Sequence, residues 1–375
     1  MPRVSVPVAV LAVCGPLCAA AWAHHGFGRF DLSTEIELEG TLTGVDFVNP
    51  HAYLYFDAPA ADGGVMPMRC EMRAATVLRR SGWSEEMFLT GAHVSIVGRP
   101  HRDDPASCYI ETLTIGDAPT VERYEQFTEA APDTRAERPL RLPSGEPNIA
   151  GDWAQEQYLL ASPPEGRGGL VPKSMVEAVE SGEIAMAEVP EAGWGARPVT
   201  LTEAGQAAAD AVREAPIEDH PRMRCEITSI LFDWVFDGPI NRITQSENEI
   251  TLEYGRGLTR TIRLDLEEHP AGIEPSRAGH SIGRWENGTL VVDTVGFLPG
   301  ILAGDVPHSG QLHVVERFTL ETEPLALKRD YVAEDPVYFT DRYVGSDTVK
   351  PADAPFAVDP CEELTYRNYS REGRE

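Results

Sequence analysis

The sequence predicts a mainly β protein with two barrels: a small OB-like barrel followed by a larger antiparallel barrel of the lipocalin or calycin type. Apolar and polar side chains alternate in many short segments, which is typical of strands with one buried face. The 33 Gly and 30 Pro residues among 375 supply turns between these segments. We therefore expect four parts: a signal peptide over 1–23, an OB-like barrel over 24–117, a linker over 118–148 and a lipocalin-like barrel over 149–375.

The first segment has the plan of a secretory signal peptide. Arg3 precedes an apolar run from Val4 to Cys18, and Ala21-Trp22-Ala23 provides a small-x-small cleavage site. The run is too short to span a bilayer. A lipid anchor at Cys14 or Cys18 is a weaker alternative, because a large side chain precedes each cysteine. We expect a periplasmic or secreted protein without a transmembrane segment.

The charge balance excludes several classes of partner. The chain has 32 basic and 60 acidic residues, for a net charge of -28. Such a surface repels nucleic-acid phosphates and anionic lipid headgroups. The sequence also has no Walker motif and no G-x-G-x-x-G after a strand, so nucleotide chemistry is not expected. We therefore predict no nucleic-acid partner.

Five short strands with one helix between the third and the fourth predict the small barrel. In the first strand the alternation slips by one residue at Gly44, which indicates a β-bulge. Asn49-Pro50 ends this strand, and Gly82 ends the helix. The expected strands are 35–47, 52–56, 66–72, 93–98 and 109–115, and the expected helix is 74–81.

The second half is predicted to contain one short helix and about nine strands. Thr200 and Glu203 form a capping box before the helix 204–213. Asn287-Gly288 between two alternating segments predicts a type I′ hairpin. Closure into a barrel removes exposed strand edges, and a two-sheet sandwich is the alternative. The expected strands are 227–232, 242–246, 250–254, 259–264, 280–286, 289–294, 312–319, 326–332 and 338–343.

Four cysteines remain after signal cleavage, which suggests two structural disulfides in an exported protein. Their spacing does not match a zinc site. Four cysteines allow three pairings, of which the simplest is Cys70–Cys108 with Cys225–Cys361, one disulfide for each domain.

Several motifs resemble families of unknown function. The motifs His24-His25-Gly26-Phe27, Asn49-Pro50-His51 and Leu78-Arg79-Arg80-Ser81-Gly82-Trp83 resemble an uncharacterised family of exported bacterial proteins that begin with His-His after the signal. In the second half, Gly279-His280-Ser281-Ile282-Gly283-Arg284-Trp285-Glu286 and Leu290-Val291-Val292-Asp293-Thr294 are similar to another uncharacterised group. Neither resemblance implies an activity.

The histidines near the cleavage site form the first candidate site. Cleavage after Ala23 makes His24 the first residue, so its amine and ring nitrogen can chelate one metal ion together with His25 or His51. Imidazole nitrogens suit Cu(II), which makes copper the expected cofactor. Cleavage one residue earlier places a histidine third, which also favours copper or nickel. The alternative is a solvated terminus with His51 as a turn residue.

A second candidate site is a polar set on the strands of the larger barrel. A histidine and a carboxylate brought together there can perform acid–base chemistry. The alternative is a network of polar groups that stabilise one another. No G-x-S-x-G motif indicates a serine hydrolase. The candidate catalytic residues are His280, Asp293, His308, His313 and Glu316, and the candidate ligand-binding residues are Arg284, Trp285, Glu286 and Arg317.

Aromatic residues of the second half, such as Trp153, Trp234 and Trp285, either line a ligand cavity or fill the core. Three functions follow from these observations. The leading one is binding of a small apolar or amphipathic molecule in the larger barrel. The second is an isomerase, cyclase, lyase or hydratase that acts on a lipophilic substrate by acid–base chemistry. The third is an envelope scaffold that binds another protein through the small barrel.

Overall fold

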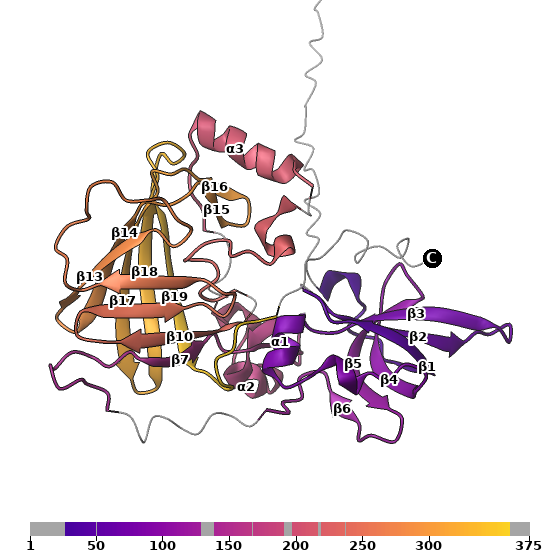
Figure 1. Cartoon of the computed structure of the whole chain (residues 1–375). Coiled ribbons are helices and arrows are strands. Elements are labelled where there is room, and N and C mark those ends of the chain that lie inside the picture. The colour runs from indigo at the N-terminus through magenta and orange to yellow at the C-terminus, as the bar shows by residue number, and fades with distance from the viewer. Residues whose placement is uncertain are drawn as a thin grey trace, which may run out of the picture.

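Two β barrels stand next to each other and are joined through the short helix α1 (Figure 1). The computed structural model describes residues 27–49, 51–128, 139–166, 168–190, 197–216, 219–236 and 238–360. The expected signal peptide, His24, His25 and Cys361 lie outside these ranges. Among the described residues, no helix has the length and apolar character needed to cross a membrane.

The smaller barrel is built as the sequence predicts. Its strands are β1 (Ile36–Asp46), β2 (Tyr53–Pro59), β3 (Val65–Glu71), β4 (His93–Pro100) and β5 (Ser107–Ile115), and α1 (Ala75–Arg80) connects β3 to β4. The strand order is β3-β2-β1-β4-β5, and a parallel β3–β5 pairing closes the barrel. The short strand β6 (Val121–Glu122) pairs with β5. Pairing of β1 with β2 shifts register between Leu42 and Gly44, which confirms the predicted bulge.

A disulfide fixes the closure of the smaller barrel. Cys70 on β3 and Cys108 on β5 lie opposite each other in the parallel pairing, and both are fully buried. The pairing predicted for these two cysteines is therefore confirmed. Cys225 is also disulfide-bonded, and its predicted partner Cys361 lies outside the described residues.

The larger barrel closes through nine strands in the order β10-β11-β12-β13-β14-β17-β18-β19-β7. Every neighbouring pair is antiparallel except β12 and β13, which are parallel. The connection between these two strands, residues 264–279, must therefore return along the barrel. The bounds are β7 (Gly151–Ala154), β10 (Ile240–Gln245), β11 (Glu249–Glu253), β12 (Thr259–Arg263), β13 (His280–Glu286), β14 (Thr289–Val295), β17 (His313–Thr322), β18 (Leu325–Glu334) and β19 (Tyr343–Pro351).

Short elements decorate this barrel. Two-stranded sheets are formed by β8 with β9 and by β15 with β16. The N-cap of α3 is Thr202, whose hydroxyl accepts from the Gly205 amide; the predicted cap Thr200 instead donates to Asp341. The bounds are β8 (Tyr158–Ala161), β9 (Gly169–Pro172), α2 (Val176–Glu180), α3 (Glu203–Glu214), β15 (Gly300–Ala303) and β16 (Val306–His308).

Residues 227–236, which we call the plug segment, pack inside the larger barrel. The predicted strand 227–232 is wrong, because within the described part of the chain these backbone groups pair with no neighbouring strand. Arg329 donates instead to the carbonyls of Ile230 and Leu231, and the Tyr254 hydroxyl donates to Ile230. Trp234 packs edge-on against Tyr254 and Phe318. The aromatic residues here fill the core, as the second of the two interpretations proposed.

A predicted strand at 338–343 is also wrong, since β19 begins only at Tyr343. The preceding turn is held by Asp335, whose carboxylate accepts from the amides of Val337 and Tyr338. These side-chain bonds keep the turn out of the sheet.

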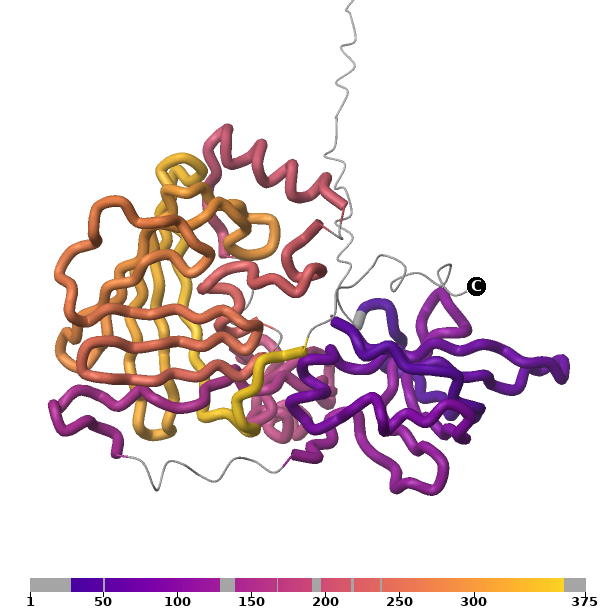
Figure 2. The backbone as a smooth tube through the Cα atoms, in the orientation of Figure 1, coloured from indigo at the N-terminus to yellow at the C-terminus, as the bar shows by residue number. Residues whose placement is uncertain are grey.

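Polar contacts connect the two barrels through α1. Arg80 pairs with Asp353 at 2.5 Å and donates to the carbonyls of Gly238 and Gln155 at 2.9 and 3.1 Å. Arg79 pairs with Asp359 at 3.0 Å. Figure 2 shows the last described residues, in yellow, crossing from the larger barrel to this helix.

Candidate functional site

The candidate catalytic residues lie in three different places in the larger barrel: its outer face, its interior and strand β16. Along β13, β14 and β17 the fully buried positions alternate with less buried ones. His280, Asp293 and His313 lie on the outer face, whereas the fully buried Glu316 points inward. His308 lies apart from both groups, on β16. The structure thus brings together three of the five predicted residues.

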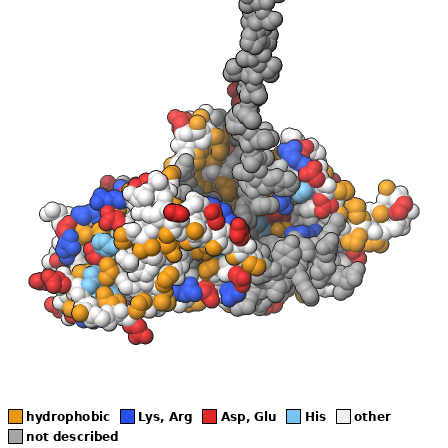
Figure 3. Space-filling view, turned by 90° about the horizontal axis from the view of Figure 1, so that it is seen from above, with side chains coloured by type: hydrophobic (Ala, Val, Ile, Leu, Met, Phe, Trp, Pro, Cys, Tyr) orange, Lys and Arg blue, Asp and Glu red, His pale blue; other side chains and the backbone are white. Residues whose placement is uncertain are grey.

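The outer-face residues form one hydrogen-bonded cluster with a fourth member, His269. Nε2 of His313 lies 3.0 Å from Oδ1 of Asp293, and Nε2 of His269 lies 3.0 Å from the same oxygen. Nδ1 of His269 lies 2.8 Å from Nδ1 of His280. We call these four residues the histidine cluster; Figure 3 shows His side chains on the surface of the larger barrel.

Hydrogen-bonding chemistry assigns the protons in this cluster. The Asp293 carboxylate only accepts, so His269 and His313 each donate from Nε2. A neutral His269 then accepts at Nδ1 from the Nδ1–H of His280. That arrangement leaves Nε2 of His280 with a lone pair, which is what a general base requires.

The environment moves the pKa values of the two outer histidines in opposite directions. The hydrogen bond to Asp293 raises the pKa of His313 above its usual value. Burial, together with His269 and Arg263, lowers the pKa of His280. The hydrogen bond from His313 in turn lowers the pKa of Asp293. Opposite shifts of this kind separate an acid from a base at one site.

A concave surface of about 500 Å³ adjoins the histidine cluster. Strand register aligns Asp293, Val315, Val332 and Val344 in one row across β14, β17, β18 and β19. The neighbouring row contains Arg317, Asp330 and Ser346. The three valines and the neighbouring row line the concavity, together with Arg197, Tyr331 and Gly345, and Asp293 lies just outside it, opposite Val315. We call this surface the valine groove.

Of the four predicted ligand-binding residues, three lie near this groove as an ion-paired group. Glu286 accepts from Arg284 at 2.7 Å and from Arg317 at 2.8 Å. Only Arg317 lines the groove. Trp285 packs against the buried core of the barrel instead. The groove therefore has a charged margin beside its apolar row.

Glu316 belongs to a buried ion network inside the barrel. Arg260 donates to it at 2.5 Å, and Arg329 at 3.2 Å. Arg329 also pairs with Asp347 at 2.5 Å. Each of these side chains is almost completely inaccessible to solvent. This arrangement fits the interpretation of a network of polar groups that stabilise one another, and it gives Glu316 no access to a ligand from outside.

His269 is the member of the cluster that sequence reasoning missed. It lies in the connection 264–279, which has no strand or helix periodicity. The available signal was the length of this connection, because a parallel strand pair requires a crossover that runs the length of the sheet. The residue of this connection that contacts Asp293 is decided by the path of the backbone between β12 and β13. Hydrophobic periodicity does not predict that path.

The remaining metal candidate in the described chain is His51. Its Nδ1 lies 2.9 Å from Oε1 of Glu71. Burial disfavours the charged form of Glu71, but the hydrogen bond from His51 and the charges of His51, Arg123 and Arg69 together outweigh it and leave the pKa of Glu71 lowered. Within the described ranges, no three His, Cys, Asp or Glu side chains are placed to hold a metal ion.

Fold and site together define a two-barrel β protein with an OB-like first barrel and a surface histidine cluster on the second. Residues 12–109 match the model of a family of unknown function, DUF6152. This match supports the expectation of an uncharacterised domain at the N-terminus, and the resemblance noted for the second half stays a prediction. No curated protein matches the sequence.

Proposed function

We propose that this is an exported protein that binds a small amphipathic molecule in the valine groove. The observation that carries the proposal is the alignment of Val315, Val332 and Val344 beside a polar row in a concavity of about 500 Å³. Val344 is 53% exposed, although burial of such a side chain is favourable. Export is supported by the signal-like start and by the Cys70–Cys108 disulfide.

The lining of the groove defines the chemistry of the ligand. Apolar ligand surface would lie over the three valines, and ligand polar groups would face Arg317, Asp330 or Ser346. Ligand sites typically combine a mostly apolar wall with a few polar groups that fix orientation. An amphipathic molecule can pack against the valine row and also hydrogen-bond to the polar row. A purely apolar molecule can do only the first, and a highly charged molecule only the second.

Binding can be tested with the fluorescent amphiphile 1-anilinonaphthalene-8-sulfonate. A carboxylate at the centre of the groove, in Val332→Asp, should weaken probe binding at least tenfold. Thr348→Asp is the matched control, because Thr348 is exposed on β19 and does not line the groove. Equal affinity of Val332→Asp and the wild type would overturn the proposal, provided that circular dichroism shows both folded.

A second candidate function is acid–base catalysis at the histidine cluster. His280 and His313 carry opposite pKa shifts. His280 pairs with Val295, and the β14–β17 register continued by one residue beyond Thr294 and Val314 brings His313 to the other side of Val295. Two strand spacings separate their backbones by about 10 Å. A small carbonyl compound between them can lose a carbon-bound proton to Nε2 of His280. Its oxygen takes a proton from Nδ1 of the charged His313, whose Nε2–H is held by Asp293. The C–H bond breaks, an O–H bond forms and the product is an enol.

Deuterium exchange into cyclohexanone tests this chemistry without a known substrate. Exchange at the carbons beside the carbonyl should be faster with the wild type than in buffer. It should fall to the buffer rate in both His280→Ala and His313→Ala. His93→Ala is the control, because His93 is exposed on β4 of the other barrel. Exchange at the buffer rate with the wild type would reject cyclohexanone-type chemistry at this cluster.

The third candidate is a copper site of His24, His25 and His51 at the processed N-terminus. Arg29 lies close enough to Tyr53 to affect its pKa, and Tyr53 pairs in register with Glu71, the partner of His51. The described chain therefore begins near His51. Exported protein should retain about one copper ion, and an alanine inserted before His24 should abolish retention. Undiminished copper in the insertion variant would exclude the site.

A further inference from the structure

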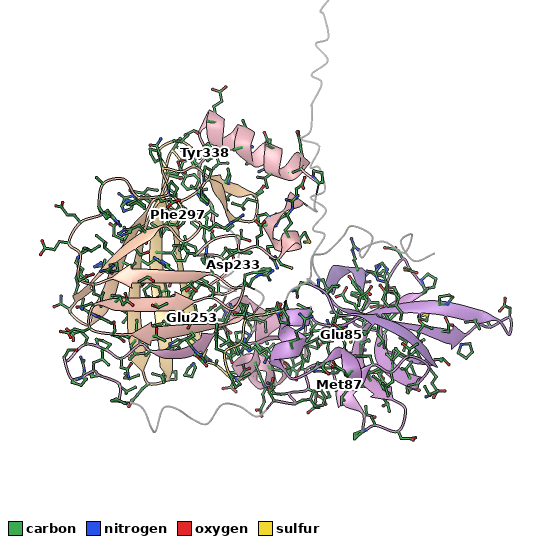
Figure 4. All side chains as sticks on the ribbon, in the orientation of Figure 1. Glu85, Met87, Asp233, Glu253, Phe297 and Tyr338 are labelled. Carbon is green, nitrogen blue, oxygen red and sulfur yellow. A yellow bond between two sulfur atoms is a disulfide. The ribbon has the colours of Figure 1, made fainter. Side chains whose placement is uncertain are left out.

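A second concavity, which none of these proposals uses, lies between the plug segment and the β15–β16 hairpin. Its volume is about 80 Å³. Phe297, Leu302 and Leu312 provide apolar walls, Thr228 comes from the plug segment and His308 from β16. We call it the Phe297 cavity; Figure 4 labels Phe297 toward the end of the larger barrel, above Asp233.

His308 presents an open ring nitrogen in this cavity. Its side chain is nearly buried, with 5% exposure, and Nδ1 lies 3.1 Å from the Ser309 carbonyl oxygen. A carbonyl only accepts, so Nδ1 carries the proton and Nε2 has a lone pair. Among the described residues, Nε2 has no hydrogen-bond partner. Burial lowers the pKa of His308, which keeps the ring neutral at pH 7.

The orientation of this ring is fixed by its neighbours. The Asp335 carboxylate accepts from both the amide and the hydroxyl of Ser309, the residue whose carbonyl holds His308. Phe297 packs edge-on against the imidazole, with ring centroids 6.1 Å apart. The acceptor at Nε2 is therefore held in place before any ligand arrives.

Thr228 supplies a second polar group without a partner. Its amide donates to Asp233, which positions the residue, but its buried hydroxyl makes no hydrogen bond in the described structure. Leaving a buried hydroxyl unpaired costs free energy. A ligand that hydrogen-bonds to both Thr228 and His308 recovers that cost.

Gly300 keeps the space beside His308 open. A Cβ added at this position would lie 3.1 Å from Nε2 of His308. Gly300 is exposed, and the adjacent Leu298 is 46% exposed, so the cavity opens to solvent here. Any larger residue at 300 would obstruct the approach to the ring nitrogen.

We propose that the Phe297 cavity binds a short neutral alcohol. The alcohol hydroxyl donates to Nε2 of His308 and accepts from the hydroxyl of Thr228. One functional group of the ligand therefore hydrogen-bonds to both unpaired polar groups of the cavity. Its hydrocarbon part packs against Phe297, Leu302 and Leu312. The small volume limits the ligand to a few non-hydrogen atoms, so affinity in the millimolar range is expected.

The comparison of 2-propanol with acetone tests this proposal, because the two have the same skeleton and only the alcohol has a donor. In the folded full-length protein, 2-propanol should shift the ¹⁵N resonance of His308 Nε2 in a saturable way. Acetone should bind at least tenfold more weakly. Equal responses to both compounds, or no response to 2-propanol because the cavity holds only water, would overturn the proposal.

Two variants probe the site without removing His308. Thr228→Val preserves shape and removes the hydroxyl, and Gly300→Ala narrows the approach to Nε2; each should reduce 2-propanol affinity at least fivefold. Gly28→Ala is the matched control, since a Cβ at Gly28 meets nothing within 4 Å. Unchanged 2-propanol affinity in both Thr228→Val and Gly300→Ala would place the binding elsewhere and reject the site.

Discussion

Asp293 on β14 and His313 on β17 lie diagonally across a pair of antiparallel strands, with Nε2 of His313 3.0 Å from Oδ1 and 3.1 Å from Oδ2. Because His269 contacts the same carboxylate from a different segment, Asp293 connects the crossover to the sheet. The pair is partly exposed, so its protonation can follow the pH of the surroundings.

The Asp293–His313 pair predicts a defined pH dependence of stability. The folded pKa of His313 is above 6.5, so its contribution is fully present below that value and is lost as pH rises through the folded pKa. The folded pKa of Asp293 is below 3.8, so its contribution is present above 3.8 and is lost as pH falls through the folded pKa. The pair should therefore stabilise the folded protein most between pH 3.8 and pH 6.5, where both contributions are present.

Asp293→Asn tests this dependence. The pKa of His313, followed by NMR, should fall toward its ordinary value, because the carboxylate that favours the charged ring is gone. The loss in free energy of unfolding should be larger at pH 5.5 than at pH 8. Glu334→Gln, which removes a carboxylate with a smaller effect on the pKa of His313, should shift that pKa less. A loss of equal size at both pH values would contradict the assignment.

Arg329 is predicted to be essential for the stability of the larger barrel. Arg329→Met removes the partner of Glu316 and Asp347 and both bonds to the plug segment. Glu316 keeps Arg260, but the buried Asp347 carboxylate is left without an ion-pair partner in the described structure. Leaving it unpaired should lower the free energy of unfolding by about 3–5 kcal/mol. Burial already raises the pKa of Asp347, so the loss should be larger at pH 8 than at pH 5.

A double variant separates the charge effect from packing. Arg329→Met combined with Asp347→Leu removes the uncompensated charge of Asp347, so it should be less destabilised than Arg329→Met alone in urea denaturation. If the double variant were the less stable of the two, the destabilisation in Arg329→Met would come mainly from lost packing and lost contacts with the plug segment. The unpaired carboxylate of Asp347 would then not be its main cause.

Local patterns in the sequence predicted the strands well and the assembly of the site only partly. Asn287 and Gly288 adopt φ values of 51° and 84°, as the predicted type I′ turn requires. Asp293 and Glu316 were expected to form one site, yet they lie on opposite faces of the sheet. Asp293 lies opposite Val315, so the next residue, Glu316, points to the other side. Period-two alternation gives the face of each residue only after the cross-strand register is known.

The plug segment was beyond prediction for a different reason. Its apolar residues alternate as in a strand, and nothing local indicates that distant side chains, Arg329 and Tyr254, bind its carbonyls. Tertiary hydrogen bonds outweighed the local pattern there. The same applies to His269, whose position depends on the path of a crossover that is set by the rest of the barrel.

The disulfide should contribute measurably to the smaller barrel. Cys70 and Cys108 are 38 residues apart in sequence, so the bond restricts the unfolded chain considerably. Replacing both cysteines with alanine should lower the free energy of unfolding by about 2–4 kcal/mol. The difference from the wild type should disappear when both proteins are unfolded in a strong reductant; a difference that persisted would point to lost packing rather than to the crosslink.

Arg80 is predicted to make the two barrels unfold together. Its side chain is only 6% exposed, and its contacts with Asp353, Gly238 and Gln155 all reach the larger barrel. Arg80→Ala removes these contacts, so thermal denaturation should separate into two transitions where the wild type shows one. Arg99→Ala is the control, because Arg99 pairs with Glu111 and Glu35 inside the smaller barrel. That variant should lower the stability of its own barrel without separating the transitions, and a single transition in Arg80→Ala would show that other contacts suffice to couple the barrels.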